Sequence, residues 1–365
     1  MIDEGTIGMH EAVWLITITI SAKVFFTSPA TVMQLVGAAG WYMTLVAAAL
    51  ALLGFLCIYQ LLKRFPGKDL VDIYEIALSR PLGSVFSCIT GVYALAIAFI
   101  RLAEFTQTMR VYVLPLSPNW YIIGFFVLAI FVLAKLGVES IARLSVLLVY
   151  PMLVGYTLVI MLGSQNYRLY NLYPILGHGL KATVWNGFVR SSVYGEIIVL
   201  AVFAKSFQGA QYIKREGLIS LGLSALILSS SLLFFSLSFP YHIGREIIAP
   251  MYEMAALIDY GQTLQRVEPV FLLIWIISSL ISTATMFYSF VWIFCKTFRI
   301  PDKNPIVLGG SVLVFAASLM HRDMVSIIVG AVELIRKIGS LIFFVMPLIA
   351  LTAALIRKKG TEANA

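Results

Sequence analysis

The chain contains few charged residues. Asp, Glu, Lys and Arg together make up 12% of its 365 residues, whereas soluble domains carry roughly 25%. Hydrophobic residues make up 60% of the sequence, and the mean hydropathy is +0.94. This composition excludes an ordinary soluble protein, because too few polar side chains are available to cover its surface. It indicates a protein that crosses a membrane several times.

Residues that build metal sites, disulfides and catalytic centres are also scarce. The cysteines are Cys57, Cys88 and Cys295, and they show none of the paired spacings of zinc sites or disulfide frameworks. The four histidines form no i, i+4 pair that would suggest a metal site. We find no combination of nucleophile, base and metal ligand at a reachable depth. The sequence therefore predicts no metal, no cofactor and no enzymatic activity.

Long apolar runs occupy almost the whole chain, so the sequence predicts one all-α integral membrane domain over residues 1–365. A helix needs about 20 mostly apolar residues to cross the hydrocarbon core, and about ten such segments follow one another. The opening residues lack the basic region and cleavage site of a signal peptide, so segment 1 is expected to remain a membrane helix. In chain order the segments are 10–35, 40–62, 82–113, 119–135, 140–163, 183–207, 217–239, 268–295, 305–320 and 335–356.

Lys and Arg are distributed unevenly between alternate loops. When the N-terminus is placed inside, the inner loops receive the larger share of these residues, as short cytoplasmic loops do. Both termini are therefore predicted to be cytoplasmic, and Arg336 and Lys337 are assigned to an outer loop. The net charge of +8 follows from this bias toward the anionic lipid bilayer and does not indicate nucleic-acid binding.

Five charged residues remain inside the apolar segments. Lys23 lies in segment 1, Arg101 and Glu104 lie in segment 3, and Arg190 and Glu196 lie in segment 6. An ionisable side chain at membrane depth is costly and normally faces a cavity, a partner or a pathway. These residues predict transport or ligand sensing.

Two segments carry polar and flexible residues near their middle, which is typical of an interrupted helix. Segment 1 reads WLITITISAKVFFTSPATVMQ, in which threonines and serines surround Lys23. Segment 6 reads VWNGFVRSSVYGEIIVLAVFAKSFQG, in which Gly195 precedes Glu196. Two interrupted helices five segments apart predict an inverted five-plus-five repeat with a binding site at the breaks. The repeats would cover about 10–163 and 183–356.

Several longer stretches carry a resemblance that goes beyond hydropathy. They are KRFPGKDLVDIYEIALSRPLG, ESIARLSVLLVYPML, YNLYPILGHGL, YGEIIVL and RVEPVFLLIWIISSLISTATMFYSF. As a set they resemble the GerAB-type spore germination permease family. This family contains the transporter-like B subunits of bacterial spore germinant receptors and belongs to the amino acid/polyamine/organocation superfamily.

The resemblance implies a LeuT-like fold of ten helices, no catalysis, and a place in the bacterial cell membrane or the inner spore membrane. It also implies assembly with a larger A-type subunit and a lipoprotein C-type subunit. A nutrient germinant, commonly an amino acid, would bind between segments 1 and 6. A free-standing proton-coupled amino acid or amine transporter would use the same residues, so the sequence leaves receptor and carrier open.

Lys23 departs from the pattern of the family. Family members tend to carry small residues such as Gly-Ala-Gly at the break in segment 1, and this chain has Ser21, Ala22 and Lys23 there, followed by Val24. We predict that Lys23 occupies or borders the position where related sodium-coupled transporters hold a cation, and that it pairs with Glu196 across the two breaks. The alternative is that Lys23 extends along segment 1 to water.

The other candidate site residues lie in segments 3, 6 and 8. Glu196 either accepts a hydrogen bond from a ligand ammonium group or holds segment 1 in place. Arg101 and Glu104 share one helical face and are expected to pair within their helix. Arg190 is expected to extend to the outer water, with attraction of a ligand carboxylate as the alternative. Predicted walls of the site, with ordinary helix packing as the alternative, are Tyr93, Ser192, Tyr194, Gly195, Phe287 and Tyr288.

Two amphipathic stretches are predicted outside the membrane core. Residues 67–80 alternate apolar and charged side chains and predict a short helix on the cytoplasmic surface. We interpret this helix as a connector, with docking to a partner subunit as the alternative. Residues 245–266 are placed on the outer side, where they would form a lid over the site.

Overall fold

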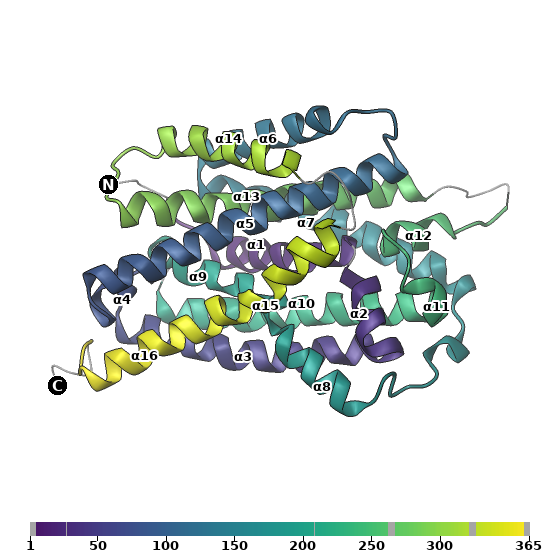
Figure 1. The fold of residues 1–365 in the computed structure, drawn as a ribbon, viewed down its shortest axis with the longest axis horizontal. Helices are drawn as coiled ribbons and strands as arrows, with labels where there is room; N and C mark the ends of the chain where they lie inside the picture. Colours follow the sequence, from purple (N-terminus) through teal and green to yellow (C-terminus); the bar gives the residue numbers. More distant parts are fainter. Residues whose placement is uncertain (1–4, 27, 208, 262–266, 321–325, 361–365) are drawn as a thin grey trace.

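The computed structural model describes residues 5–26, 28–207, 209–261, 267–320 and 326–360. Regular structure within these ranges is helical, and the longer helices run roughly along the long axis of the molecule (Figure 1). Seven helical stretches among the described residues are long and apolar enough to cross a membrane. They are Ser28–Arg64, Arg80–Tyr112, Asn119–Leu136, Val138–Asn166, Ala210–Ser238, Glu268–Thr297 and Gly330–Ile356. The chain is therefore an all-helical integral membrane protein.

Segment 1 is interrupted, as the sequence predicts. α1 (Met9–Ser21) ends at the 3-10 turn η1 (Ala22–Phe25), and α2 (Ser28–Val36) then leaves the direction of α1 (Figure 1). Two side chains near the end of α1 bond to backbone carbonyl oxygens one turn back: Thr19 donates to Leu15 O at 2.7 Å and Ser21 donates to Thr17 O at 2.6 Å. Such bonds compete with the helical backbone pattern and favour an interruption.

Segment 6 is also interrupted, and here the break is longer. α8 (Leu180–Val189) passes into η5 (Ser191–Ile198), an eight-residue 3-10 stretch, before α9 (Val199–Val202) and η6 (Ala204–Ser206). A 3-10 run of this length is uncommon and often marks a functional hinge. A Cβ at Gly195 would lie 1.7 Å from Cδ2 of Phe343, so only glycine allows segment 10 to approach the break this closely.

The remaining elements include one region that the sequence does not predict. The helix that contains segment 10 begins earlier than the sequence predicts and includes two π-helical stretches, η7 (Ser326–Val332) and η8 (Leu341–Val345), on either side of α15 (Glu333–Ser340). π-helical turns are rare and frequently lie at functional sites. The other elements are η2 (Gly37–Ala39), α3 (Gly40–Arg64), α4 (Leu70–Ala77), α5 (Arg80–Tyr112), α6 (Asn119–Leu136), α7 (Val138–Leu162), η3 (Gly163–Asn166), η4 (Leu169–Leu172), α10 (Ala210–Ser238), α11 (Tyr241–Gly244), α12 (Pro250–Ala256), α13 (Glu268–Thr297), α14 (Asn304–Met320) and α16 (Met346–Ile356).

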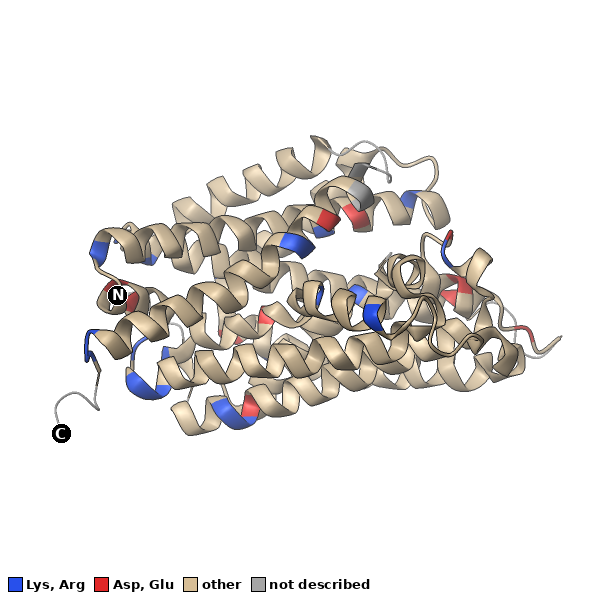
Figure 2. Cartoon of the chain, turned by 60° about the horizontal axis from the view of Figure 1, so that its bottom comes forward, with Lys and Arg blue, Asp and Glu red and all other residues tan. Residues whose placement is uncertain are grey.

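The first and last described residues lie at the same end of the molecule, beside α4 (Figure 1). Gly5 packs against Glu139 at the start of α7, and Lys359 donates to the carbonyl oxygen of Ile76 in α4 at 2.7 Å. Charged residues gather at this end, and further charged residues lie near the middle of the molecule (Figure 2). The cytoplasmic placement of this end stays a prediction.

The two predicted amphipathic stretches lie at opposite ends. α4 forms within residues 67–80, and most of its apolar side chains are buried. α12 forms within the predicted outer lid, next to α11 and at the end away from α4 (Figure 1). Residues 262–266 of that lid lie outside the described residues, and its closing role stays a prediction.

Candidate binding site at the helix breaks

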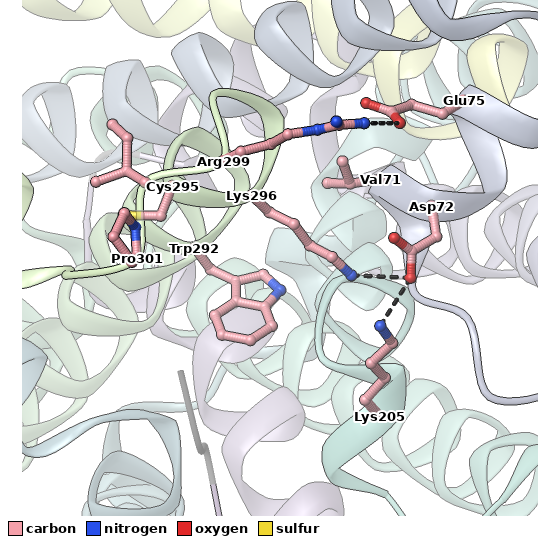
Figure 3. Close-up of a pocket in the computed structure, with 10 residues that line it drawn as sticks. Val71, Asp72, Glu75, Lys205, Trp292, Cys295, Lys296, Arg299 and Pro301 are labelled. Carbon is pink, nitrogen blue, oxygen red and sulfur yellow. Dashed lines mark hydrogen bonds and ion pairs between the residues drawn. The ribbon is translucent and has the colours of Figure 1, made fainter. Parts of the chain in front are cut away.

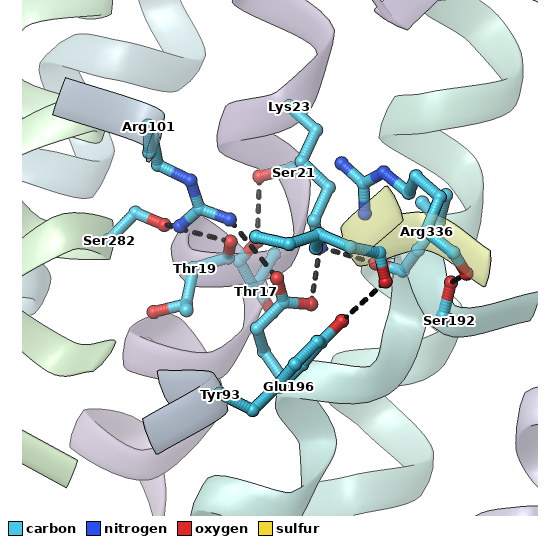
Figure 4. A network of polar contacts seen from close by, with 12 residues as sticks. Thr17, Thr19, Ser21, Lys23, Tyr93, Arg101, Ser192, Glu196, Ser282 and Arg336 are labelled. Carbon is cyan, nitrogen blue, oxygen red and sulfur yellow. Dashed lines mark hydrogen bonds and ion pairs between the residues drawn. The ribbon is translucent and has the colours of Figure 1, made fainter. Parts of the chain in front are cut away.

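Lys23 and Glu196 form a buried ion pair between the two helix breaks. The Lys23 ammonium group donates to Glu196 Oε2 and to the backbone carbonyl oxygen of Val193 (Figure 4). Lys23 is 2% exposed and Glu196 is 1% exposed. The predicted contact between these residues is confirmed, and the alternative in which Lys23 extends to water is wrong.

Arg101 supplies a second cation to the same carboxylate. Its Nη2 donates to Glu196 Oε1 at 3.0 Å, and its Nη1 donates to the hydroxyl of Ser282 in α13 (Figure 4). The Ser282 hydroxyl in turn donates to the carbonyl oxygen of Thr19 at 3.0 Å. We name the group of Lys23, Arg101 and Glu196 the break cluster. Its contacts connect segments 1, 3 and 6, and the hydroxyl of Ser282 extends them to segment 8.

Arg190 is buried near the break cluster and does not extend to water. Its guanidinium group forms an ion pair with Glu333 of α15, and the residue is 5% exposed. This corrects the expectation from the sequence. The physical reason is that α15 crosses segment 6 at this point and offers a carboxylate that the hydropathy pattern had placed outside the segment.

Backbone carbonyl oxygens hold α15 against segments 3 and 6. Tyr93 donates from its hydroxyl to Ile335 O at 2.8 Å, and Ser192 donates to Arg336 O at 2.8 Å. Gly339 lies so close to Tyr93 that a Cβ there would be 2.3 Å from the tyrosine hydroxyl oxygen. Tyr93 and Ser192 are therefore at the site, but both contact the protein backbone.

A cavity of about 30 Å³ lies between α5, η5 and α15. Five candidates from the sequence analysis line this cavity: Tyr93, Arg101, Glu104, Ser192 and Glu196. The pairing of Arg101 with Glu104 stays a prediction. The complete lining is Tyr93, Ile97, Ile100, Arg101, Glu104, Ser192, Glu196, Val332, Ile335 and Arg336.

Arg336 is a site residue that the sequence analysis missed. It had been assigned to an outer loop, and this assignment is corrected, because the helical stretch Gly330–Ile356 begins before it and carries it to the cavity. The signal was present in the sequence as the charged turn with Glu333, Arg336 and Lys337 beside an apolar run.

Other predicted site residues face elsewhere. Phe287 packs against Gly310 of α14, whereas Tyr288 stacks on Phe203 and accepts a hydrogen bond from Lys303 at 3.0 Å. Phe287 and Tyr288 are not among the residues that line this cavity, since α13 faces the break cluster with Ser282. Their role as walls of the ligand site stays a prediction.

The candidate residues on either side of Lys23 and Glu196 are buried. Tyr194 donates to Thr44 O of α3 at 3.1 Å and, with Val24, lines a separate cavity of about 10 Å³. Ser21 and Ala22 are buried at the end of α1. A direct role of these residues in ligand binding stays a prediction.

A larger cavity, about 440 Å³, lies at the α4 end of the molecule (Figure 3). Asp72 of α4 contacts Lys205 at 2.8 Å and Lys296 at 2.9 Å, and Lys296 also pairs with the fully buried Asp69. Asp69 caps the N-terminus of α4 by accepting a hydrogen bond from Asp72 N at 3.1 Å. These contacts fix α4 to the ends of segments 6 and 8.

The fold that surrounds the site is that of a membrane transporter. The chain is similar to a Na⁺-coupled sialic acid symporter that was solved in a substrate-bound, outward-open state, with a TM-score of 0.63. The match covers 94% of this chain and 79% of the symporter, at 12% sequence identity. At this identity the similarity shows the fold alone, which is of the LeuT type.

Sequence comparison assigns the family. The family of spore permeases, described as "Spore germination protein", matches residues 6–326, and the chain belongs to this family. Spore germination protein KB of Bacillus subtilis (strain 168) is 20% identical over 282 residues, which cover 76% of this chain and 74% of that protein. The family is transporter-like and is not a family of enzymes.

Proposed function

We propose that this chain is the nutrient-binding, transporter-like subunit of a spore germination receptor complex in the inner spore membrane, and that its germinant is an amino acid. The observation that carries the proposal is the break cluster, a buried carboxylate between two cations where segments 1 and 6 are both interrupted. Breaks of this kind expose backbone groups that bind ligands in transporters. Membership of the spore germination family supplies the biological setting.

Lys23 takes the place of a coupling cation in this proposal. Its ammonium group is held by a carboxylate oxygen of Glu196 and the carbonyl oxygen of Val193, and interrupted helices present the same kinds of oxygen to a bound ion. A cation that is covalently attached to segment 1 cannot cross the membrane with the ligand. This arrangement favours a receptor that changes shape over a carrier that is driven by an ion gradient.

The proposal also includes the arrangement of the membrane helices and the response of the partner subunits. Ten membrane helices are arranged as two inverted repeats, about 10–163 and 183–356, with the germinant between segments 1 and 6. Binding shifts one repeat relative to the other, because the ligand has a higher affinity for one arrangement. An A-type subunit and a lipoprotein C-type subunit then respond to that shift. The two interrupted helices and the likeness to a transporter fold support this view.

A binding panel on the purified chain in detergent tests the proposal. We expect one or a few of the common L-amino acids to raise the thermal unfolding midpoint, because a ligand at 100 times its Kd adds about 2.7 kcal/mol to the free energy of unfolding. The stabilisation should be lost in the double variant Lys23→Met/Glu196→Gln, which removes both members of the pair and leaves only Arg101 without its carboxylate partner.

The matched control is Glu139→Gln, which removes a partly exposed carboxylate that pairs with Arg143 near the start of α7. This variant should respond to the ligand as the wild type does. A folded wild-type chain that no amino acid stabilises, or a double variant that keeps the full response, would contradict the proposal. Uptake of the stabilising amino acid into liposomes by the chain alone would instead identify a carrier.

A further inference from the structure

Arg336 brings to the cavity a cation that the contacts of the break cluster do not use. The residue lines the cavity together with Glu196 and Ser192, and its own carbonyl oxygen accepts the Ser192 hydroxyl. Its guanidinium group points from α15 toward the Lys23 side of the network (Figure 4). In the part of the chain that the structure describes, no carboxylate pairs with this guanidinium group. Its donors are therefore available to an anion.

The charges around the cavity favour an anionic group. Arg101 and Arg336 line it with Glu104 and Glu196, and Lys23 adds a further cation next to Glu196. Among the described residues, three cations thus lie around two carboxylates, and all of them are buried except Arg336, which is half-buried. A ligand carboxylate would give Arg336 a counter-ion, and a guanidinium group binds a planar carboxylate through two parallel hydrogen bonds.

An anion bound to Arg336 would contact α15, and α15 has to move when a ligand binds. The cavity volume of about 30 Å³ is far below the roughly 300 Å³ of the smallest ordinary ligand pockets, so α15 has to move before a ligand of amino-acid size fits. The π-helical stretches η7 and η8 bound α15 on both sides. Contacts from Tyr93, Arg190 and Ser192 attach α15 to segments 3 and 6.

We propose that Arg336 binds the carboxylate of the ligand, so that the chain selects carboxylate-bearing ligands over otherwise identical molecules that lack this group. This inference rests on the proposed function, because it assigns one group of the same ligand to one residue of the same site. It differs from that function in naming the residue and the chemical group that determine specificity.

Each stabilising L-amino acid is compared with its own carboxamide, which keeps the side chain and the amine but lacks the carboxylate. The proteins are the wild type, Arg336→Met, Arg336→Lys and the control Lys337→Met, whose lysine lies on the same helix and is 64% exposed. We expect the wild type and the control to bind the acid about 10 to 100 times more tightly than the amide. Arg336→Met should bind the two equally, and Arg336→Lys should retain part of the preference.

The outcomes separate this inference from the proposed function. If Arg336→Met binds amino acids and keeps the full preference for the acid, another residue holds the carboxylate and the inference is wrong, whereas the proposed function stands. The same holds if the wild type binds acid and amide equally. If no amino acid binds to the folded wild type, the proposed function fails and this inference fails with it. Arg336→Lys keeps the test valid if Arg336→Met does not fold.

Discussion

Replacing Glu196 with glutamine is expected to lower the free energy of unfolding by about 3–5 kcal/mol, the usual result of removing one member of a buried ion pair. Glu196 is the carboxylate that both Lys23 and Arg101 contact. The substitution therefore leaves two buried cations without their common anion. Thermal unfolding of the purified variant in detergent measures the effect, and Glu139→Gln, in a partly exposed pair, should change the stability by less than about 1 kcal/mol.

The double variant shows whether Lys23 and Glu196 interact directly. Lys23→Met alone leaves Glu196 paired with Arg101, so its effect should be smaller than that of Glu196→Gln. The loss in Lys23→Met/Glu196→Gln should fall short of the sum of the two single losses by at least about 1 kcal/mol, because the second substitution removes a charge that the first had left unpaired. Additive losses would contradict a direct pair.

Adding a methyl group at Gly195 is expected to force segment 10 away from the break in segment 6. A Cβ at Gly195 would lie 1.7 Å from Cδ2 of Phe343, whose ring is 1% exposed and has little room to move. Gly195→Ala should therefore lower the free energy of unfolding by about 1–3 kcal/mol, as overpacking does. It should also weaken ligand stabilisation, since α15 directly precedes η8 and its Phe343.

Two further variants make this prediction specific. Gly222→Ala adds the same methyl group in α10 where no other atom lies within 4 Å, and it should leave stability nearly unchanged or slightly increased. Phe343→Leu, combined with Gly195→Ala, should recover part of the lost stability because the smaller side chain makes room. A Gly195→Ala protein as stable as the wild type would mean that segment 10 does not pack against the break in this way.

Much of the site could be predicted because its signals are local in the sequence. Serines, threonines and a glycine within apolar segments weaken the helix, and both interruptions form there. Lys23 and Glu196 are isolated charges at membrane depth, and an isolated buried charge requires a partner. Their contact follows once the two breaks are placed side by side.

The rest depends on how the helices are rotated and bent, which apolar segments do not reveal. α13 is apolar on most sides, so the sequence did not show that it faces the break cluster with Ser282 and turns Phe287 away. Arg101 reaches another helix, a contact that depends on the packing of segments 3 and 6. Arg336 was missed because it lies at the predicted start of segment 10 and was therefore assigned to the outer loop, whereas η7 begins this helix earlier.

The most direct test of the central claim is the germination of spores that carry this chain together with the proposed A-type and C-type subunits. Loss of spore refractility is followed after addition of each amino acid that stabilises the purified protein. The account predicts that wild-type and Glu139→Gln spores respond, and that Lys23→Met/Glu196→Gln spores with the same amount of the protein do not respond while still germinating with nutrients sensed by other receptors. An unchanged response of the double variant would contradict a germinant site at the helix breaks.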